Sequence, residues 1–212
     1  MSLSYYDRKE VSNSMLSALK HELEGREMPD NIQDIFDFGN LVDAMITEPD
    51  RIDYAASTMD GKPAKDFELA LSMRNAFERN ETCQAVINGA DFQKVSVKNR
   101  SFQHRLNNHL FNFSLDCRCK WDFFNKHGIS GDIKTTSATT RKQFIAACDH
   151  FDYFRSRAWY MDLEGTNKDL IIGISKVNME IFLVPVNRGD DFYKQGVRQY
   201  TELAFKYYIL KS

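Results

Sequence analysis

Cysteine and proline are scarce in this 212-residue sequence, which contains four of each. No two cysteines form a Cys-x-x-Cys pair, so the sequence indicates neither a disulfide framework nor a cysteine-based metal site. No apolar stretch approaches the roughly 18 residues that a membrane-spanning helix needs, and the first residues lack the apolar core of a secretory signal. We therefore expect a cytoplasmic protein with reduced thiols that does not contact a membrane.

An excess of charge of one sign is also missing. The 28 Lys and Arg residues nearly balance the 30 Asp and Glu residues, for a formal net charge of −2, so bulk charge does not draw the protein to nucleic acid or anionic lipid. The distribution is uneven, however, because residues 94–158 contain 12 basic but only 5 acidic residues. A basic segment of this kind suits a polyanion such as DNA, although it could also merely balance an acidic helical half within the fold.

Glycine-rich phosphate-binding loops and nucleophile elbows are absent, which argues against P-loop, dinucleotide-binding and serine or cysteine hydrolase functions. Aromatic residues, in contrast, are plentiful, with 16 Phe, 9 Tyr and 2 Trp. A chain of this length can bury roughly 70% of its unfolded surface without a disulfide or a metal. We expect the whole chain, residues 1–212, to form a single domain.

The hydrophobic periodicity changes near residue 90. Residues 1–90 are expected to form a helical part, with helices over residues 12–25, 32–47, 64–79 and 81–88 and a turn at 60–63. Residues 91–212 are expected to form a sheet core. Its predicted elements are two strands between 94 and 124 joined at Asn107-Asn108, strands at 129–136, 170–177 and 180–186, and helices at 140–163 and 190–210. This order predicts an α/β or α+β domain with an N-terminal helical part.

Three residues in the sheet core have the right types for metal-assisted hydrolysis. Asp132 and Lys134 are two residues apart on a predicted strand, so their side chains point to the same face. Asp122 lies near the end of the preceding strand, and a turn at 125–128 can bring it beside Asp132. Two carboxylates bind Mg²⁺ through oxygen, and an ammonium can polarise the attacking water during phosphodiester hydrolysis. The alternative is a solvated ion pair on an edge strand.

Four segments, in matching order, resemble one nuclease family. They are the helix at 10–19, the segment from Phe38 to Arg51, the strand at 118–122 and the Asp-x-Lys-Thr-Thr strand at 132–136. Together they resemble the phage and prophage exonucleases related to exodeoxyribonuclease VIII (the RecE type), within the PD-(D/E)xK nuclease superfamily. The similarity covers roughly residues 10–165.

This resemblance implies an α/β, restriction-endonuclease-like mixed sheet flanked by helices. It also implies an exonuclease that depends on Mg²⁺, or alternatively Mn²⁺, and acts on double-stranded DNA ends in phage-type recombination. Assembly into a homo-oligomer and a phage single-strand annealing protein as partner are implied as well. We expect Asp122, Asp132 and Lys134 to lie on one edge of the sheet, with the helix from Thr140 packed across it.

The resemblance also assigns roles to residues. Asp122 and Asp132 would bind the metal, the Ile133 carbonyl would be a further ligand, and Lys134 would assist the water. Asp43 stands where the family has a His and would be an extra oxygen ligand. The residues expected to bind DNA are Lys120, Arg141, Lys142, Arg155, Arg157 and Tyr160.

The sequence departs from the family pattern at several positions. Ser156 replaces the family's Gln, Trp121 replaces a Pro, and a Glu upstream of the acidic strand has no clear counterpart. Two other functions therefore stay open: a non-catalytic nucleic-acid-binding or assembly protein on the same fold, and a type II-like endonuclease.

Overall fold

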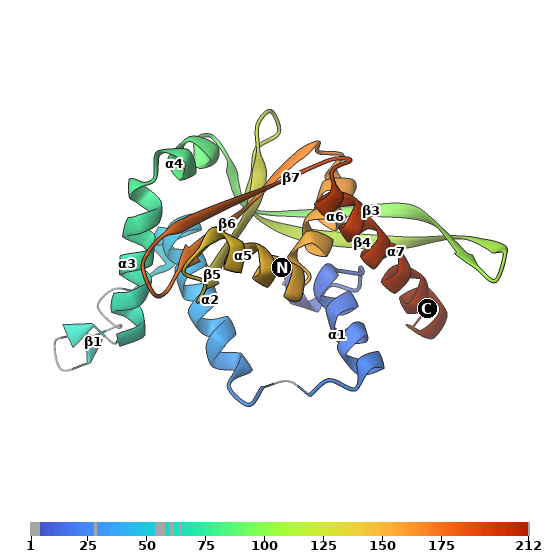
Figure 1. Cartoon of the computed structure of the whole chain (residues 1–212), viewed down its shortest axis with the longest axis horizontal. Coiled ribbons are helices and arrows are strands. Elements are labelled where there is room, and N and C mark those ends of the chain that lie inside the picture. The colour runs from blue at the N-terminus through green and yellow to red at the C-terminus, as the bar shows by residue number, and fades with distance from the viewer. Residues whose placement is uncertain (1–4, 28, 54–57, 60–61, 64, 212) are drawn as a thin grey trace.

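The computed structural model describes residues 5–27, 29–53, 58–59, 62–63 and 65–211 (Figure 1). The N-terminal part is helical, as the periodicity predicts. Its elements are η1 (Tyr5–Asp7), α1 (Asn13–Glu24), α2 (Ile32–Thr47), η2 (Pro49–Arg51), α3 (Lys65–Arg79) and α4 (Glu81–Ile87), with a small hairpin of β1 (Thr58–Met59) and β2 (Lys62–Pro63). The turn predicted at 60–63 includes residues 60 and 61, which lie outside the described residues.

The ends of α1 illustrate how local sequence sets these bounds. The Ser12 hydroxyl accepts a hydrogen bond from the Met15 N–H and so satisfies one of the free donors of the first turn. Gly25 ends the helix in the left-handed conformation, with φ at 62°, which glycine adopts without a steric penalty.

One five-stranded mixed sheet forms the centre of the molecule. Its strands are β3 (Asp91–Leu106), β4 (His109–Phe124), β5 (Ser130–Thr136), β6 (Lys168–Ser175) and β7 (Ile181–Asn187), in the spatial order β3-β4-β5-β6-β7. β5 and β6 are parallel and the other neighbours are antiparallel. Helices flank the sheet (Figure 1), so the α/β fold with a mixed sheet flanked by helices is confirmed.

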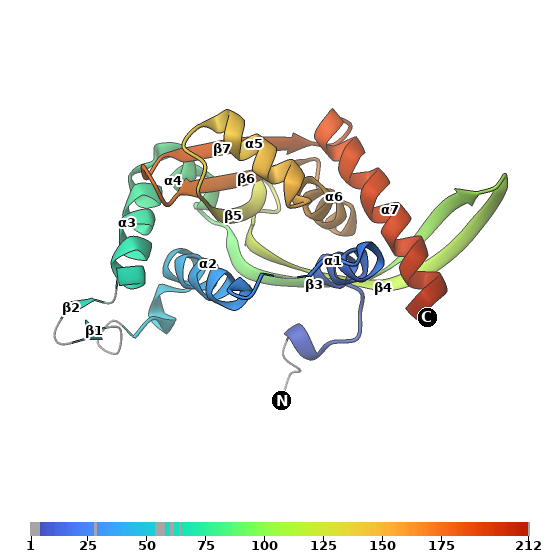
Figure 2. The same ribbon diagram turned by 60° about the horizontal axis from the view of Figure 1, so that its bottom comes forward.

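The long β3–β4 hairpin turns at Asn107-Asn108, where the sequence predicts it. Both residues have positive φ angles, 47° and 65°, as a tight two-residue hairpin turn requires. The hairpin extends beyond the body of the sheet and past the C-terminal end of α7 (Asp191–Lys211), which crosses it (Figure 2). Phe113 packs there against Phe205 and Tyr208 of α7.

β4 and β5 separate almost as soon as they meet. Their register consists of the pair Phe123 and Gly131, so Asp122 and Asp132 lie where the two strands diverge. These strands are the second and third of the five. The expectation that Asp122, Asp132 and Lys134 lie on an edge of the sheet is therefore wrong, because β4 and β5 are interior strands.

The helix predicted over 140–163 is two helices, α5 (Arg141–His150) and α6 (Tyr153–Glu164). Asp152 interrupts them with a φ of 57°, a left-handed conformation that ends regular helix. Its carboxylate accepts hydrogen bonds from Lys20 at 2.7 Å and Arg155 at 3.0 Å. These contacts stabilise the break, and α5 then lies on β6 and β7, with Phe144 over Gly173.

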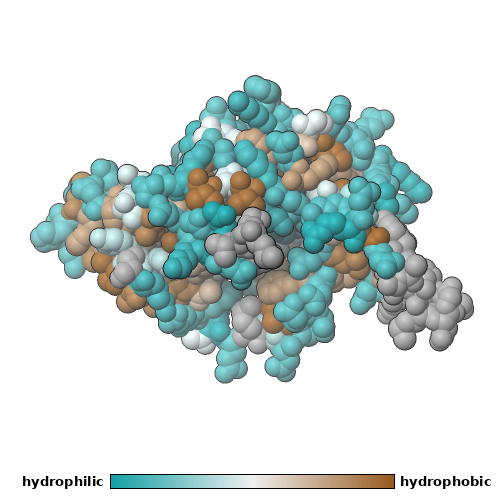
Figure 3. Space-filling model, turned by 180° about the vertical axis from the view of Figure 1, so that it is seen from behind, coloured by the Kyte–Doolittle hydropathy of each residue, from teal (hydrophilic) through white to brown (hydrophobic). Residues whose placement is uncertain are grey.

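The hydrophobic core lies on both faces of the sheet. On one face, α2 and α3 pack around Ile133 and Ile172. On the other, α6 and α7 bury both tryptophans, Trp121 and Trp159. All four cysteines are buried and unpaired. The rear surface is mostly hydrophilic, with hydrophobic residues in separate patches (Figure 3), and within the described part no helix is long and apolar enough to cross a membrane.

Candidate active site

The separation of β4 from β5 creates a place for paired carboxylates. The Ile133 N–H donates a hydrogen bond of 2.7 Å to Asp122 Oδ2, in the position where a neighbouring strand would present a carbonyl. Asp122 thereby reaches across to β5, and its carboxylate interacts electrostatically with that of Asp132. The structure thus places the two carboxylates near each other, and their role as metal ligands stays a prediction.

Asp132 also holds two cations. Lys134 Nζ lies 2.5 Å from Asp132 Oδ2, which shows that both side chains point to the same side of β5. Arg157, on α6, places Nη1 3.2 Å from Asp132 Oδ1. The Lys134 ammonium also donates to the Ile133 carbonyl at 3.3 Å, so that carbonyl oxygen lies at the same cluster.

Asp43 approaches the cluster from α2. Gln93 Nε2 donates to Asp43 Oδ2 at 2.8 Å, and Asp43 interacts electrostatically with Asp122, Asp132 and Lys134. The other oxygen, Asp43 Oδ1, is buried and has no hydrogen-bond partner among the described residues. Below, "the carboxylate cluster" means Asp43, Asp122 and Asp132 together with Lys134 and Arg157.

The pKa values of the cluster follow from burial and neighbouring charge. Burial, together with the charges of Asp132 and Asp43, raises the pKa of Asp122 well above its usual value. Burial alone would also raise the pKa of Asp132, but Lys134 and Arg157 outweigh it and hold that pKa below the ordinary value. Burial disfavours the charge of Lys134, yet Asp132 and Asp122 raise its pKa above the ordinary value. In the metal-free site these two carboxylates thus favour the ammonium form of Lys134.

Carboxyl groups outnumber basic side chains at this point in the fold. Arg157 forms a bidentate pair with buried Asp169, through Nε at 2.9 Å and Nη2 at 3.0 Å, so one of the two cluster cations already serves an additional carboxylate. With Asp169 and Lys120 included, four carboxylates face three basic side chains. Repulsion between the carboxylates contributes to the raised pKa of Asp122, and a divalent cation would relieve that repulsion, since carboxylate oxygens are the ligands that Mg²⁺ prefers.

The donor set therefore fits a hydrated divalent cation. Among the described residues, no group of three or more His, Cys, Asp or Glu side chains forms a ready-made metal site. Mg²⁺ usually keeps several waters and takes one or two carboxylates, and the adjacent Asp122 and Asp132 suffice for that. Asp43, whose Oδ1 is buried without a hydrogen-bond partner among the described residues, would be the third carboxylate near such a cation.

The predictions for Arg155 and Arg157 as DNA-contacting residues are wrong. The two side chains are 1% and 0% exposed. Arg155 donates to Asn13, Ser17 and Asp152, which ties α6 to α1. Arg157 is committed to Asp132 and Asp169, so both guanidinium groups neutralise interior carboxylates instead of facing phosphate.

Tyr160 is part of the same interior arrangement. Its half-buried ring lies edge-on to Trp121, at 5.3 Å between centroids, and 4.4 Å from the guanidinium carbon of Arg157. These contacts orient the guanidinium that holds Asp132. They assign Tyr160 a packing contact, and its predicted contact with DNA stays a prediction.

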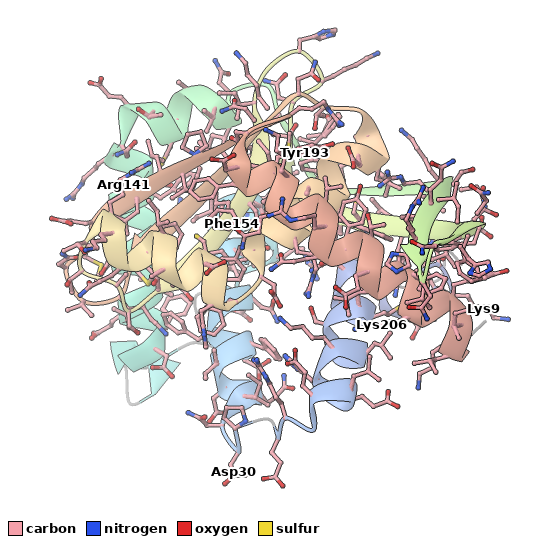
Figure 4. All side chains as sticks on the ribbon, turned by 45° about the vertical axis from the view of Figure 1, so that its right-hand side comes forward. Lys9, Asp30, Arg141, Phe154, Tyr193 and Lys206 are labelled. Carbon is pink, nitrogen blue, oxygen red and sulfur yellow. The ribbon has the colours of Figure 1, made fainter. Side chains whose placement is uncertain are left out.

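The remaining predicted DNA-binding residues are on the surface. Lys120 is half-buried on β4, beside Asp43 and Asp122. Arg141 and Lys142 are exposed in the first turn of α5, and Arg141 Nε donates to the Leu183 carbonyl of β7 at 3.3 Å (Figure 4). The basic segment thus does not present all its cations on one face, because Lys94 and Lys98 pair with Glu164 and several arginines are buried.

Two contributors to the site were missed from the sequence. Gln93, which binds Asp43, lies at the start of a strand and matches no motif. Asp169, which pairs with Arg157, is the second residue of β6, and its only sequence signal is that it is an acidic residue directly before an apolar run. Its complete burial is detectable only from the fold.

The comparisons with known proteins concern the fold. No protein-family model matches the sequence, and no curated protein sequence matches it at a significant level. The structure is similar to the crystal structure of a candidate exonuclease from Eubacterium rectale, with a TM-score of 0.62 and 14% identity over 97% of this chain and 85% of that one. A phage-related exonuclease from Haemophilus somnus 129PT matches with a TM-score of 0.37 and 11% identity, over 79% of this chain and 92% of that one. The first similarity shows a shared fold.

Proposed function

We propose that this protein is a metal-dependent deoxyribonuclease, an exonuclease that hydrolyses phosphodiester bonds at duplex ends in phage-type recombination. The observation that carries the proposal is the pair of neighbouring carboxylates, Asp122 and Asp132, beside the Lys134 ammonium where β4 and β5 separate, with Asp122 held by the Ile133 N–H next to Asp132. The resemblance of the motifs to phage exonucleases supports it, as does the fold shared with the Eubacterium rectale protein. Self-assembly and a single-strand annealing partner belong to the same proposal.

Each residue has a distinct task in this proposal. Asp122 and Asp132 hold the cation, which when bound supplies Lewis-acid activation of water and of a phosphate oxygen. Lys134 remains protonated and donates hydrogen bonds to the developing negative charge on the reacting phosphate. Arg157 holds Asp132 through Oδ1, whereas Lys134 contacts Oδ2, and the rings of Trp121 and Tyr160 lie against the Arg157 guanidinium.

Digestion of matched DNA substrates tests the function. Purified protein with Mg²⁺ is expected to degrade a linear duplex progressively from its ends and to leave a closed circular duplex of the same sequence intact. Chelation with EDTA should stop the reaction, and added Mn²⁺ should restore it. Cleavage of the circle would instead indicate an endonuclease. Binding of linear DNA without cleavage under any divalent cation would favour the non-catalytic binding or assembly function.

Lys120 should account for about one phosphate contact. Because it lies beside the carboxylate cluster and keeps solvent access, Lys120→Ala is expected to weaken DNA binding similarly for all sequences. The slope of log affinity against log salt concentration should become shallower by about 0.9, the value for one neutralised phosphate.

Arg105→Ala is the matched control, because Arg105 is an exposed cation near the far tip of the β3–β4 hairpin, and it should leave the slope unchanged. Fluorescence anisotropy across a salt series measures both. A wild-type affinity that does not depend on salt would contradict contact between this surface and phosphate.

A further inference from the structure

Gln93 has an unusual backbone conformation for its position. It lies within β3 with a φ of 52°, although its neighbours Phe92 and Lys94 keep their pairing with Phe123 and Trp121 of β4. The register places it across from Asp122. A non-glycine residue in the left-handed region is strained, and such strain persists only where surrounding contacts hold it.

The side chain of Gln93 makes the contacts that hold it. Its Nε2 donates to Asp43 Oδ2 at 2.8 Å and to Thr47 Oγ1 at 2.9 Å, so both amide protons are used. Thr47 Oγ1 in turn donates to the Asp43 carbonyl at 2.9 Å, one turn earlier on α2. The strained residue therefore connects the strand that carries it to the helix that carries Asp43.

This connection leaves one carboxylate oxygen of Asp43 uncommitted. Asp43 Oδ2 is occupied by Gln93, whereas Oδ1 is buried without a hydrogen-bond partner among the described residues. An unpaired buried acceptor is costly unless it meets a ligand or an ordered water. An amide is well suited to hold Asp43, because it donates hydrogen bonds without adding or neutralising charge.

We propose that Gln93 is a positioning residue, which holds Asp43 so that its free oxygen accepts from the hydrated cation at Asp122 and Asp132. This inference rests on the cation site of the proposed function but not on nuclease activity. It predicts that loss of the Gln93 amide weakens cation binding through Asp43, without loss of the fold.

Cation binding and thermal stability of the full chain test this proposal together. Mn²⁺ affinity can be measured by electron paramagnetic resonance of free Mn²⁺, and the melting temperature by circular dichroism. Gln93→Gly is expected to weaken Mn²⁺ binding by roughly 10–100-fold, the usual effect of removing a group that orients a metal ligand. Its melting temperature without metal should change little, because relief of the backbone strain offsets the loss of the two hydrogen bonds to Asp43 and Thr47. If Gln93 had a purely structural role, Gln93→Gly would lower the Mn²⁺ affinity and the melting temperature together.

Two further variants control the result. Asn108→Gly also replaces a residue of positive φ, 65° at the tip of the hairpin, and should leave Mn²⁺ affinity unchanged. Gln93→Gly made in an Asp43→Asn background should weaken Mn²⁺ binding no further than Asp43→Asn alone, because Gln93 acts through Asp43.

The outcomes separate this inference from the proposed function. Wild-type affinity in Gln93→Gly, or full additivity of the two substitutions, would overturn the positioning role. The wild type could bind Mn²⁺ more tightly than Gln93→Gly and yet cleave no DNA. That result would support the positioning role and overturn the nuclease function. A wild-type protein that binds no Mn²⁺ would overturn both.

Discussion

Asp122→Asn should reduce single-turnover cleavage by roughly 10³-fold or more while leaving the fold as stable as before, or more stable. The loss of rate follows because this carboxylate is one of the two that hold the cation, and the electrostatic stabilisation that the cation provides is typically a dominant part of such catalysis. The preserved stability follows from the site itself. Asp122 is a buried carboxylate next to two others, and an amide of the same shape removes that repulsion.

The local hydrogen bonds support this separation of activity from stability. An asparagine oxygen can still accept from the Ile133 N–H, and its amide can donate toward Asp132. Urea unfolding without metal should show a free energy of unfolding that is unchanged or up by about 1 kcal/mol, the scale of one net hydrogen bond.

Asp116→Asn is the matched control for this experiment. Asp116 is an exposed carboxylate on the same strand that accepts from Asn99, and its substitution should affect neither rate nor stability. Full nuclease activity in Asp122→Asn would discard the assigned site. A large loss of stability would show that the carboxylate is needed by the fold rather than by the cation.

Features that depend on neighbouring residues could be predicted from the sequence. The helix from Ile32 to Thr47 matches its predicted bounds, because its apolar spacing and the following Pro49 are local signals. The hairpin at Asn107-Asn108 and the shared direction of Asp132 and Lys134 follow from turn chemistry and from strand alternation. The pairing of Asp122 with Asp132 needed only a short turn between two strands.

Features that depend on distant partners could not be predicted. The break between α5 and α6 is stabilised by Lys20, which lies 132 residues from Asp152 in sequence. Arg157 resembles any basic residue on a helix until the fold places Asp169 and Asp132 against it. A buried arginine and a DNA-binding arginine have the same spacing in a sequence, so only the location of the carboxylates distinguishes them.

The Arg157 pair also changes what the site requires of Lys134. Sequence comparison treats the Asp-x-Lys motif as self-contained, but in the structure Asp132 keeps a second cation when the lysine is removed. Replacing Lys134 therefore leaves Asp132 paired through Oδ1, while Oδ2 loses its contact with the ammonium. Folding is therefore measured beside activity in such a variant, so that a chemical role of Lys134 is separated from a structural one.

Lys134→Ala should lower the single-turnover rate by roughly 10²–10⁴, the range for a positioned group that assists proton or charge transfer. The affinity for Mg²⁺ should stay the same or become tighter, because the Lys134 ammonium occupies Asp132 Oδ2 at 2.5 Å and competes with a cation for that oxygen. Lys134→Arg should not restore the rate, since a planar guanidinium does not replace a compact ammonium.

Lys168→Ala replaces an exposed lysine on neighbouring β6 and serves as the control. Rates at saturating Mg²⁺ and calorimetric Mg²⁺ affinities, in protein shown to be folded by circular dichroism, separate the two effects. If Lys134→Ala cleaves as fast as the wild type, Asp132 and Lys134 form a structural ion pair, and a non-catalytic DNA-binding function becomes the better explanation of the site.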